Sequence, residues 1–157
     1  MSEHKASAVP TMVSFLLCDQ VIDDKLSNKK SAIGIFNTIL VPKMPTSIHQ
    51  MAILASLTEI VGRVELEIRL VRDSDNVVLF SGKGAVEAPN PLAVVDLLFA
   101  MQGIRIPEAG PYAFELLSAG EILGRRRFQM VIRQPGPPGP AAPPGYVEPG
   151  GPPVADE

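Results

Sequence analysis

The chain has very few of the residues on which many binding and catalytic sites depend. Its 157 residues include no tryptophan, two tyrosines, two histidines and one cysteine. The scarcity of large aromatic rings weighs against a carbohydrate-stacking site and against a platform for single-stranded nucleic acid, since both stack their ligands on such rings. Cys18 cannot form an intramolecular disulfide, and its apolar surroundings predict a small buried hydrophobe. A nucleophilic cysteine would need a nearby histidine, and only His4 and His49 are present.

The chain also lacks a strong charge of either sign and a long hydrophobic run. The net charge is −3, and residues 1–133 hold all 14 basic residues and 14 of the 17 acidic ones. Such a balanced body argues against a nucleic-acid partner, which favours a basic surface. No segment approaches the roughly 20 apolar residues of a membrane span, and the N-terminus does not resemble a signal peptide. These absences predict a cytoplasmic protein without a membrane span.

Alternating apolar and polar residues are the main pattern that is present. The clearest case is 63–72, where Val64, Leu66, Ile68 and Leu70 are expected to point inward while Arg63, Glu65, Glu67 and Arg69 point outward. A final hairpin is predicted from the alternation of Tyr112, Phe114 and Leu116, the turn at Gly120, and the return through Phe128.

Strand and turn signals recur about every ten residues through the body of the chain. Besides the final hairpin, they predict strands over 11–22, 33–41, 51–60, 63–72, 77–87 and 92–101. We therefore expect an all-β fold: a single antiparallel β-sandwich of about eight strands in residues 11–133, immunoglobulin-like or C2-like in type.

The two ends of the chain differ from the body. Residues 1–10 are polar and predict a flexible N-terminal lead. Of the 24 residues in 134–157, 14 are proline or glycine, which leaves too few apolar groups to bury. This composition predicts a disordered tail, partly in the polyproline II conformation.

The acidic turns supply the only candidate metal ligands. The segment Asp73-Ser74-Asp75-Asn76 could offer oxygen ligands to calcium, with Asp19, Asp23 and Asp24 from another loop. The same residues are ordinary turn formers, because Asp and Asn side chains hydrogen-bond the nearby backbone. The turn interpretation is preferred, so neither a metal nor a cofactor is expected.

Two further features point to binding through a surface. Arg125 and Arg127 share one face of the last strand, whereas Arg126 should point the other way and pair with Asp96 or Glu115. Strands 11–22 and 92–101 are apolar on both faces, which exceeds what a two-layer sandwich needs. Outward positions on these strands are therefore candidates for self-association or partner binding, with Val95, Leu97 and Phe99 representing the second strand.

No catalytic motif is apparent. Gly82-Lys83-Gly84 lacks the spacing of a phosphate-binding loop, and Glu65 and Glu67 alternate with arginines as on a solvated strand. The sequence predicts no enzymatic activity and indicates no small-molecule substrate.

Several segments resemble an uncharacterised bacterial family of β-sandwich domains of roughly 130 residues. At the start they are Phe15-Leu16-Leu17-Cys18-Asp19-Gln20-Val21-Ile22, Lys29-Lys30-Ser31-Ala32-Ile33-Gly34-Ile35-Phe36 and Pro42-Lys43-Met44-Pro45; at the end they are Gly110-Pro111-Tyr112-Ala113-Phe114-Glu115-Leu116 and Gly120-Glu121-Ile122-Leu123-Gly124-Arg125-Arg126. The resemblance covers 11–133 and implies fold and origin only, because no activity is established for the family.

The sequence thus favours a non-enzymatic protein-interaction or assembly module, with the tail as a tether. The alternative is a C2-like binding domain regulated by calcium or another ligand, with Asp23, Asp24, Asp73 and Asp75 in its loops.

Overall fold

The computed structural model of the protein describes residues 9–136. The lead expected over 1–10 and the tail expected over 134–157 lie largely outside the described residues.

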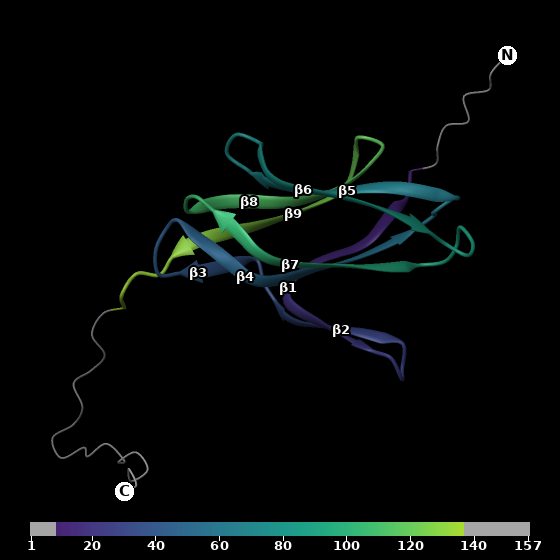
Figure 1. Ribbon diagram of the computed structural model, residues 1–157, viewed down its shortest axis with the longest axis horizontal. Helices are drawn as coiled ribbons and strands as arrows, with labels where there is room; N and C mark the ends of the chain where they lie inside the picture. Colours follow the sequence, from purple (N-terminus) through teal and green to yellow (C-terminus); the bar gives the residue numbers. More distant parts are fainter. Residues whose placement is uncertain (1–8, 137–157) are drawn as a thin grey trace, which may run out of the picture.

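Nine strands make up the fold, and residues 9–136 contain no helix (Figure 1). They are β1 (Thr11–Asp24), β2 (Lys29–Ile35), β3 (Thr38–Val41), β4 (Thr46–Thr58), β5 (Arg63–Arg72), β6 (Val77–Glu87), β7 (Val95–Ile106), β8 (Gly110–Ser118) and β9 (Glu121–Ile132). One sheet has the order β2-β1-β4-β7 and the other β3-β9-β8-β5-β6. The expected all-β sandwich is confirmed, with one strand more than the approximate count of eight.

The sheets are antiparallel apart from one pair, since β3 runs parallel to β9. The chain leaves the first sheet after β2 and enters the second as β3. The single strand expected over 33–41 is therefore wrong: its two halves lie in different sheets, separated at Phe36 and Asn37. Alternation alone could not reveal this break, because both halves carry isoleucines of the same parity.

Two other strands are longer than their apolar runs. β4 begins at Thr46 rather than 51, and β7 continues through Gly103 to Ile106, five residues beyond the strand expected over 92–101. The two strands pair over this added length, with Ile48 opposite Ile104. A polar stretch can remain in a ladder when its neighbouring strand continues, since the backbone hydrogen bonds do not depend on side chains.

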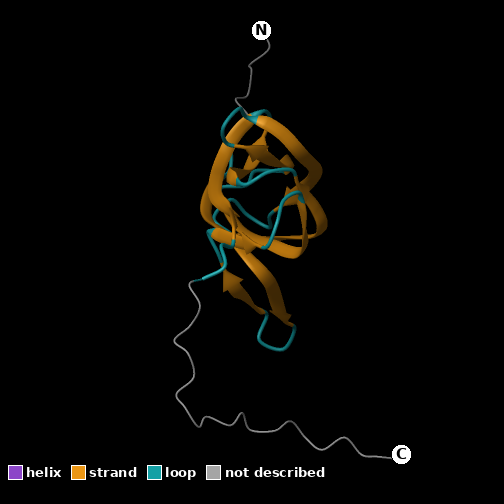
Figure 2. Cartoon of the chain, turned by 90° about the vertical axis from the view of Figure 1, so that its left-hand side faces the viewer, coloured by secondary structure: helices purple, strands orange, loops and turns teal. Residues whose placement is uncertain are grey.

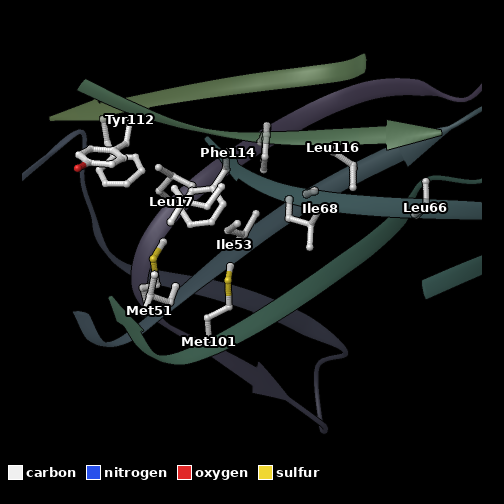
Figure 3. Close-up of a cluster of buried hydrophobic side chains, with 14 of the residues drawn as sticks. Leu17, Met51, Ile53, Leu66, Ile68, Met101, Tyr112, Phe114 and Leu116 are labelled. Carbon is white, nitrogen blue, oxygen red and sulfur yellow. The ribbon is translucent and has the colours of Figure 1, made fainter. Parts of the chain in front are cut away.

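The hydrophobic core lies between the two sheets (Figure 3). β5 contributes Val64, Leu66, Ile68 and Leu70, all buried, as its alternation predicted. β8 contributes Tyr112, Phe114 and Leu116, and the first sheet faces them with Leu17, Met51, Ile53 and Met101. Strands β1 and β9 approach closely on one side, where a Cβ at Gly124 would overlap the Met12 thioether.

An aromatic cluster fills one end of this core. The Phe128 ring stacks on Tyr112 and Phe114, with centroids 5.9 and 5.6 Å apart, and meets the edge of Phe36 at 6.3 Å. Offset and edge-on contacts of this kind suit the quadrupoles of the rings. The Tyr112 hydroxyl donates a hydrogen bond of 2.7 Å to the carbonyl oxygen of Glu108, which holds the turn before β8 against the core.

The β1–β2 hairpin projects from the body of the sandwich (Figure 2). β1 pairs with β4 only as far as Cys18, opposite Ala52, and beyond that point it pairs with β2 alone. In the part of the chain that the structure describes, β2 pairs with no strand other than β1.

We expect Phe128→Ala to lower the free energy of unfolding by about 3–5 kcal/mol, because it removes a fully buried ring that three other rings contact. Urea denaturation monitored by circular dichroism measures the loss. The matched control is Phe80→Ala on edge strand β6, where the ring is exposed and its loss leaves no internal cavity. Equal losses for the two variants would contradict this account of the core.

Candidate interaction surface

The outer faces of the two sheets differ sharply in chemistry. The five-stranded sheet presents nine charged side chains on its outer face: Arg63, Glu65, Glu67, Arg69, Lys83, Glu87, Glu115, Arg125 and Arg127. The middle of the outer face of the four-stranded sheet is apolar, and it is bordered by Ser14, Ser56 and Asp96 at one end and by Gln20, Gln50 and Gln102 at the other. The sandwich therefore has one highly charged side and one side whose middle is apolar.

Two rows of side chains form the apolar side. Pairing places Leu16 of β1 opposite Leu54 of β4, and Leu54 opposite Leu98 of β7. The next row on the same face consists of Cys18, Ala52 and Ala100. We call these six residues the outer apolar face. They lie on three adjacent strands, and the strands predicted to be apolar on both faces, β1 and β7, flank β4.

None of the six residues of the face is charged. Its nearest charged side chain is Asp96, which accepts a hydrogen bond of 2.6 Å from the hydroxyl of Ser56 at the end of the face. Gln20, Gln50 and Gln102 line a small hollow beside Ala52 and Ala100, where β1 separates from β4. Such a surface costs little to remove from water.

Cys18 lies within this face but is fully buried by its neighbours. Burial raises the pKa of its thiol, and its sulfur lies 3.6 Å from the carbonyl oxygen of Ala52. Both observations confirm that the residue is a small buried hydrophobe, since a thiol kept protonated is a poor nucleophile.

The projecting hairpin continues the apolar side of the sheet. Register places Cys18 opposite Ile35, Gln20 opposite Ile33 and Ile22 opposite Ser31, so these side chains share the side of Leu16 and Cys18. The three isoleucines are between 42% and 55% exposed. The opposite side of the hairpin carries Asp19, Asp23 and Lys30. Apolar side chains are thus concentrated on the side that faces the same way as the outer apolar face.

The positions expected to face outward on β7 need correction. Val95, Leu97 and Phe99 are half-buried and pack against the core, while Asp96, Leu98 and Ala100 point outward. Both parities of this strand are apolar, so alternation could not tell its two faces apart. Pairing with β4 decides the matter, because Leu97 lies opposite the buried Ala55 and Phe99 opposite the buried Ile53.

The arginine triplet lies on the polar sheet, within a network of ion pairs. Arg125 donates to Glu115 at 2.8 Å and also to Asp73, and Arg127 lies 3.3 Å from the same aspartate. Arg125 and Arg127 share one face as expected. The expected pairing of Arg126 with Asp96 or Glu115 is wrong, because the register sets Glu115 opposite Arg125. Because Arg125 and Asp73 already form an ion pair with each other, binding a partner through either side chain would have to break that pair.

The four candidate calcium ligands lie in two separate hairpin turns. Hydrogen bonding to Lys25 lowers the pKa of Asp23, and the Ser27 hydroxyl and the amide of Leu26 lower the pKa of Asp24. Arg72 lowers the pKa of Asp75 in the other turn. Between residues 9 and 136, no three His, Cys, Asp or Glu side chains gather where they could hold a metal ion.

A wider hollow opens at the side of the sandwich where edge strands β6 and β7 lie. Its walls are Pro45, Thr46, Ser47, Leu79, Arg105, Ile106 and Pro107. This lining has one cation and two hydroxyls but no acid–base pair, so it offers no catalytic constellation.

Some residues of the candidate surface were missed by the sequence analysis. Ala52 and Leu54 belong to a strand whose apolar character extends over both parities, the same signal that singled out β1 and β7. Ile22, Ile33 and Ile35 became candidates only once the hairpin was seen to leave the sheet, since an isoleucine in an internal strand is ordinary core.

Comparisons with known proteins identify a family but no function. The family described as "Family of unknown function (DUF6941)" matches residues 13–131. No curated protein matches the chain. Among solved structures, the chain is similar to the alkylpurine DNA glycosylase AlkC of Pseudomonas fluorescens bound to DNA with an abasic site analog, at 12% identity and a TM-score of 0.42, covering 60% of this chain and 28% of that one. It is also similar to a β-glucosidase of Listeria innocua in complex with glucose, at 9% identity and a TM-score of 0.40, covering 75% and 16%. The chain thus spans less than a third of each of these proteins.

No helix in the described residues is long and apolar enough to cross a membrane.

We expect Glu115→Gln to lower the free energy of unfolding by about 1–3 kcal/mol, because it removes the charge from a buried acceptor of Arg125. Chemical denaturation at neutral pH measures this loss. Glu65→Gln is the control: its ion pair with Arg63 is exposed on both sides, and such pairs contribute about 0–1 kcal/mol. A smaller loss for Glu115→Gln than for the control would contradict a structural role for the network.

Glu67 should make stability depend on acid pH. Hydrogen bonds from Arg69, and then from the Ser81 hydroxyl, lower its pKa from 4.5 to about 2. Because the folded pKa is depressed, this contribution is complete above the unfolded value near 4.5 and is lost as the pH falls through about 2. Glu67→Gln should therefore be less stable than the wild type at pH 7, with a difference that shrinks between pH 4.5 and 2. Urea unfolding across this range, with the exposed Glu121→Gln as control, tests the expectation; a difference independent of pH would contradict it.

Proposed function

The chain belongs to this family of unknown function, and we propose that its sandwich is a non-enzymatic protein-interaction or assembly module that binds through the outer apolar face. The observation that carries the proposal is the contrast between the two sheets. One outer face bears nine charged side chains, whereas the middle of the other bears leucines, alanines and a cysteine.

An exposed sheet face normally carries polar side chains, because antiparallel sheets in water alternate between the core and the solvent. The five-stranded sheet follows this rule strictly on β5. The four-stranded sheet departs from it at adjacent positions on three neighbouring strands, where Leu98 and Ala100 are exposed and Leu16 and Leu54 are half-buried. Contiguous apolar side chains that remain in contact with water are a mark of interaction sites.

The energetic contrast favours the same conclusion. Covering the polar sheet would require Arg125, Glu115 and Asp73 to lose water or exchange partners, which is costly for charged groups. Covering the outer apolar face displaces water from carbon atoms and gains about 25 cal/mol for each Å² of apolar surface buried. A partner therefore gains most at Leu16, Leu54 and Leu98.

As finer parts of the proposal, the sandwich is of immunoglobulin-like type and works in the cytoplasm of a bacterium. The hydrogen bond from the Tyr112 hydroxyl to the carbonyl oxygen of Glu108, at the start of β8, supports the first, since such a contact is typical of immunoglobulin-type sandwiches. The unpaired thiol of Cys18 fits a reducing compartment. The C2-like alternative would need its four aspartates to converge, and no observation favours it.

The decisive variant is Ala100→Lys, which places a charge within the outer apolar face, on its β7 side. Its control is Ala85→Lys, since both alanines are exposed and lie on edge strands, one on each sheet. The tagged full chain is used to capture partners, further copies of itself included, from a native cell lysate. We expect a specific partner with the wild type and with Ala85→Lys, and at least about tenfold less with Ala100→Lys.

Equal recovery by the two variants would place binding elsewhere. Recovery of nothing specific by the wild type would remove the proposal.

A further inference from the structure

We propose that the partner on the outer apolar face is a second copy of this chain, and that the β1–β2 hairpin of each copy lies against the face of the other. This inference rests on the proposed function and goes beyond it by naming the occupant and by giving the hairpin a role. Three features carry it: the area of the face, its lack of charge, and the side on which the hairpin carries its isoleucines.

The first argument concerns area. Pairing of β1 with β4 runs from Thr11 to Cys18. At about 3.4 Å per residue and about 4.8 Å between strands, the three strands β1, β4 and β7 present a projected area of about 400 Å² over this span. Its apolar part is smaller, because the span includes Ser56 and Asp96 and because Cys18 and Ala52 are buried. Specific interfaces bury at least about 600 Å² on each partner. The face alone is therefore too small for a stable complex.

The projecting hairpin supplies the missing area on the same side. By the same spacings its two strands extend the surface by about 200 Å² beyond Cys18. Ile22, Ile33 and Ile35 are exposed there on the side shared with Leu16 and Cys18. A partner that packs on the outer apolar face can therefore also contact these isoleucines, and the hairpin does not have to change its orientation.

The hairpin itself benefits from being covered. An isolated pair of strands is marginally stable in water, because it buries little apolar surface. The part of β1 beyond Cys18 pairs only with β2, and half-exposed isoleucines line one of its sides. Packing against another molecule would bury the isoleucines of the hairpin and so stabilise it.

The second argument is self-complementarity. In a two-fold dimer each patch meets its own copy, so a patch rich in charge of one sign would repel itself. None of the six residues of the outer apolar face is charged, and neither are the hairpin residues Ile22, Ile33 and Ile35. The row of leucines also stands beside a row of smaller side chains, Cys18, Ala52 and Ala100. A copy turned by a two-fold axis can set its leucine ridge into the other's shallow row.

Most charged groups sit where this arrangement leaves them in water. Lys30 and Asp23 pair on the far side of the hairpin, and the ion-pair network of Arg125, Glu115 and Asp73 lies on the other sheet. The charged residues on the interface side lie at its ends: Asp96 beside Ser56 at one end, and Asp24 opposite Lys29 near the tip of the hairpin at the other. Face-to-face packing centred on the row of leucines therefore places no charged side chain at the middle of the contact.

The test is the mass of the full chain in solution, measured by sedimentation equilibrium over a range of micromolar concentrations. We expect a dimer of twice 16.8 kDa for the wild type. Ile22→Lys, which charges the hairpin on its apolar side, should weaken dimerisation by about 100-fold or more. Ile122→Lys is the matched control, because Ile122 is 50% exposed against 49% for Ile22 and also lies on a hairpin strand.

A second variant tests the dimer contact at another position, so the conclusion does not depend on Ile22 alone. Leu98→Lys charges the outer apolar face itself and should weaken dimerisation as strongly as Ile22→Lys, since both side chains enter the same contact. Circular dichroism and thermal melting establish that each variant is folded.

The outcomes separate this inference from the proposed function. A wild-type monomer at every concentration, or a dimer that Ile22→Lys or Leu98→Lys leaves intact, overturns the inference. If the chain is monomeric but captures another protein that Ala100→Lys releases, the proposed function stands and the second copy is excluded. If capture and dimerisation are both absent, both proposals fail.

Discussion

The period-two alternation of a β-strand is the constraint on which the rest of this structure depends. It gives each strand one row of side chains in the core and a second row that is either exposed to water or buried against other protein. On β5 the second row is Arg63, Glu65, Glu67 and Arg69, which form two ion pairs along the strand, and the Ser81 hydroxyl of β6 donates a further hydrogen bond to Glu67. On the neighbouring strands β8 and β9, Glu115 pairs with Arg125 on the same face. On β4 the equivalent row contains Ala52 and Leu54, and its neighbours add further carbon rather than charge. The two sheets thus solve the same geometric problem in opposite ways, which divides the surface of the molecule into a hydrated side and an apolar side.

The length of β1 links the fold to the candidate surface. Its first part closes the sandwich between β4 and the neighbouring β9, while its second part leaves the sheet to pair with β2. The return of the chain is fixed at the base of this hairpin, because the amide of Phe36 donates to the carbonyl oxygen of Leu17 and the Phe36 ring contacts Phe128. Gly34 permits the close approach of Asp19, where a Cβ would collide with the carboxylate, and it adopts a positive φ of 69°. An anchored base with an unsupported arm suits a segment that is covered by another molecule.

Much of the sandwich could be predicted from alternation, whereas its pairing could not. β5, β8 and β9 have one apolar and one polar parity, so their inward residues were expected correctly. On β7 both parities are apolar, and the choice between Leu97 and Leu98 depends on which residue of β4 lies opposite. The division of 33–41 into β2 and β3 depends on contacts between sheets that are remote in sequence. The same limit applies to the arginines: alternation placed Arg125 and Arg127 on one face, but only the register shows that Glu115 meets Arg125 rather than Arg126. Local pattern therefore predicts which surfaces exist, and long-range pairing decides which residues form them.

An apolar surface is encoded in a sequence differently from a catalytic site. A catalytic site needs a few polar groups held within tenths of an ångström, and mutation of one of them shows at once as lost activity. An apolar interface distributes its free energy over many carbon contacts, so its signal is the composition of a face rather than any single residue. Leu16, Leu54 and Leu98 come from three strands separated by up to 82 positions in the sequence, and no short motif could contain them. Their alignment across one sheet follows from register alone, so this surface can be seen only once the pairing of the strands is known.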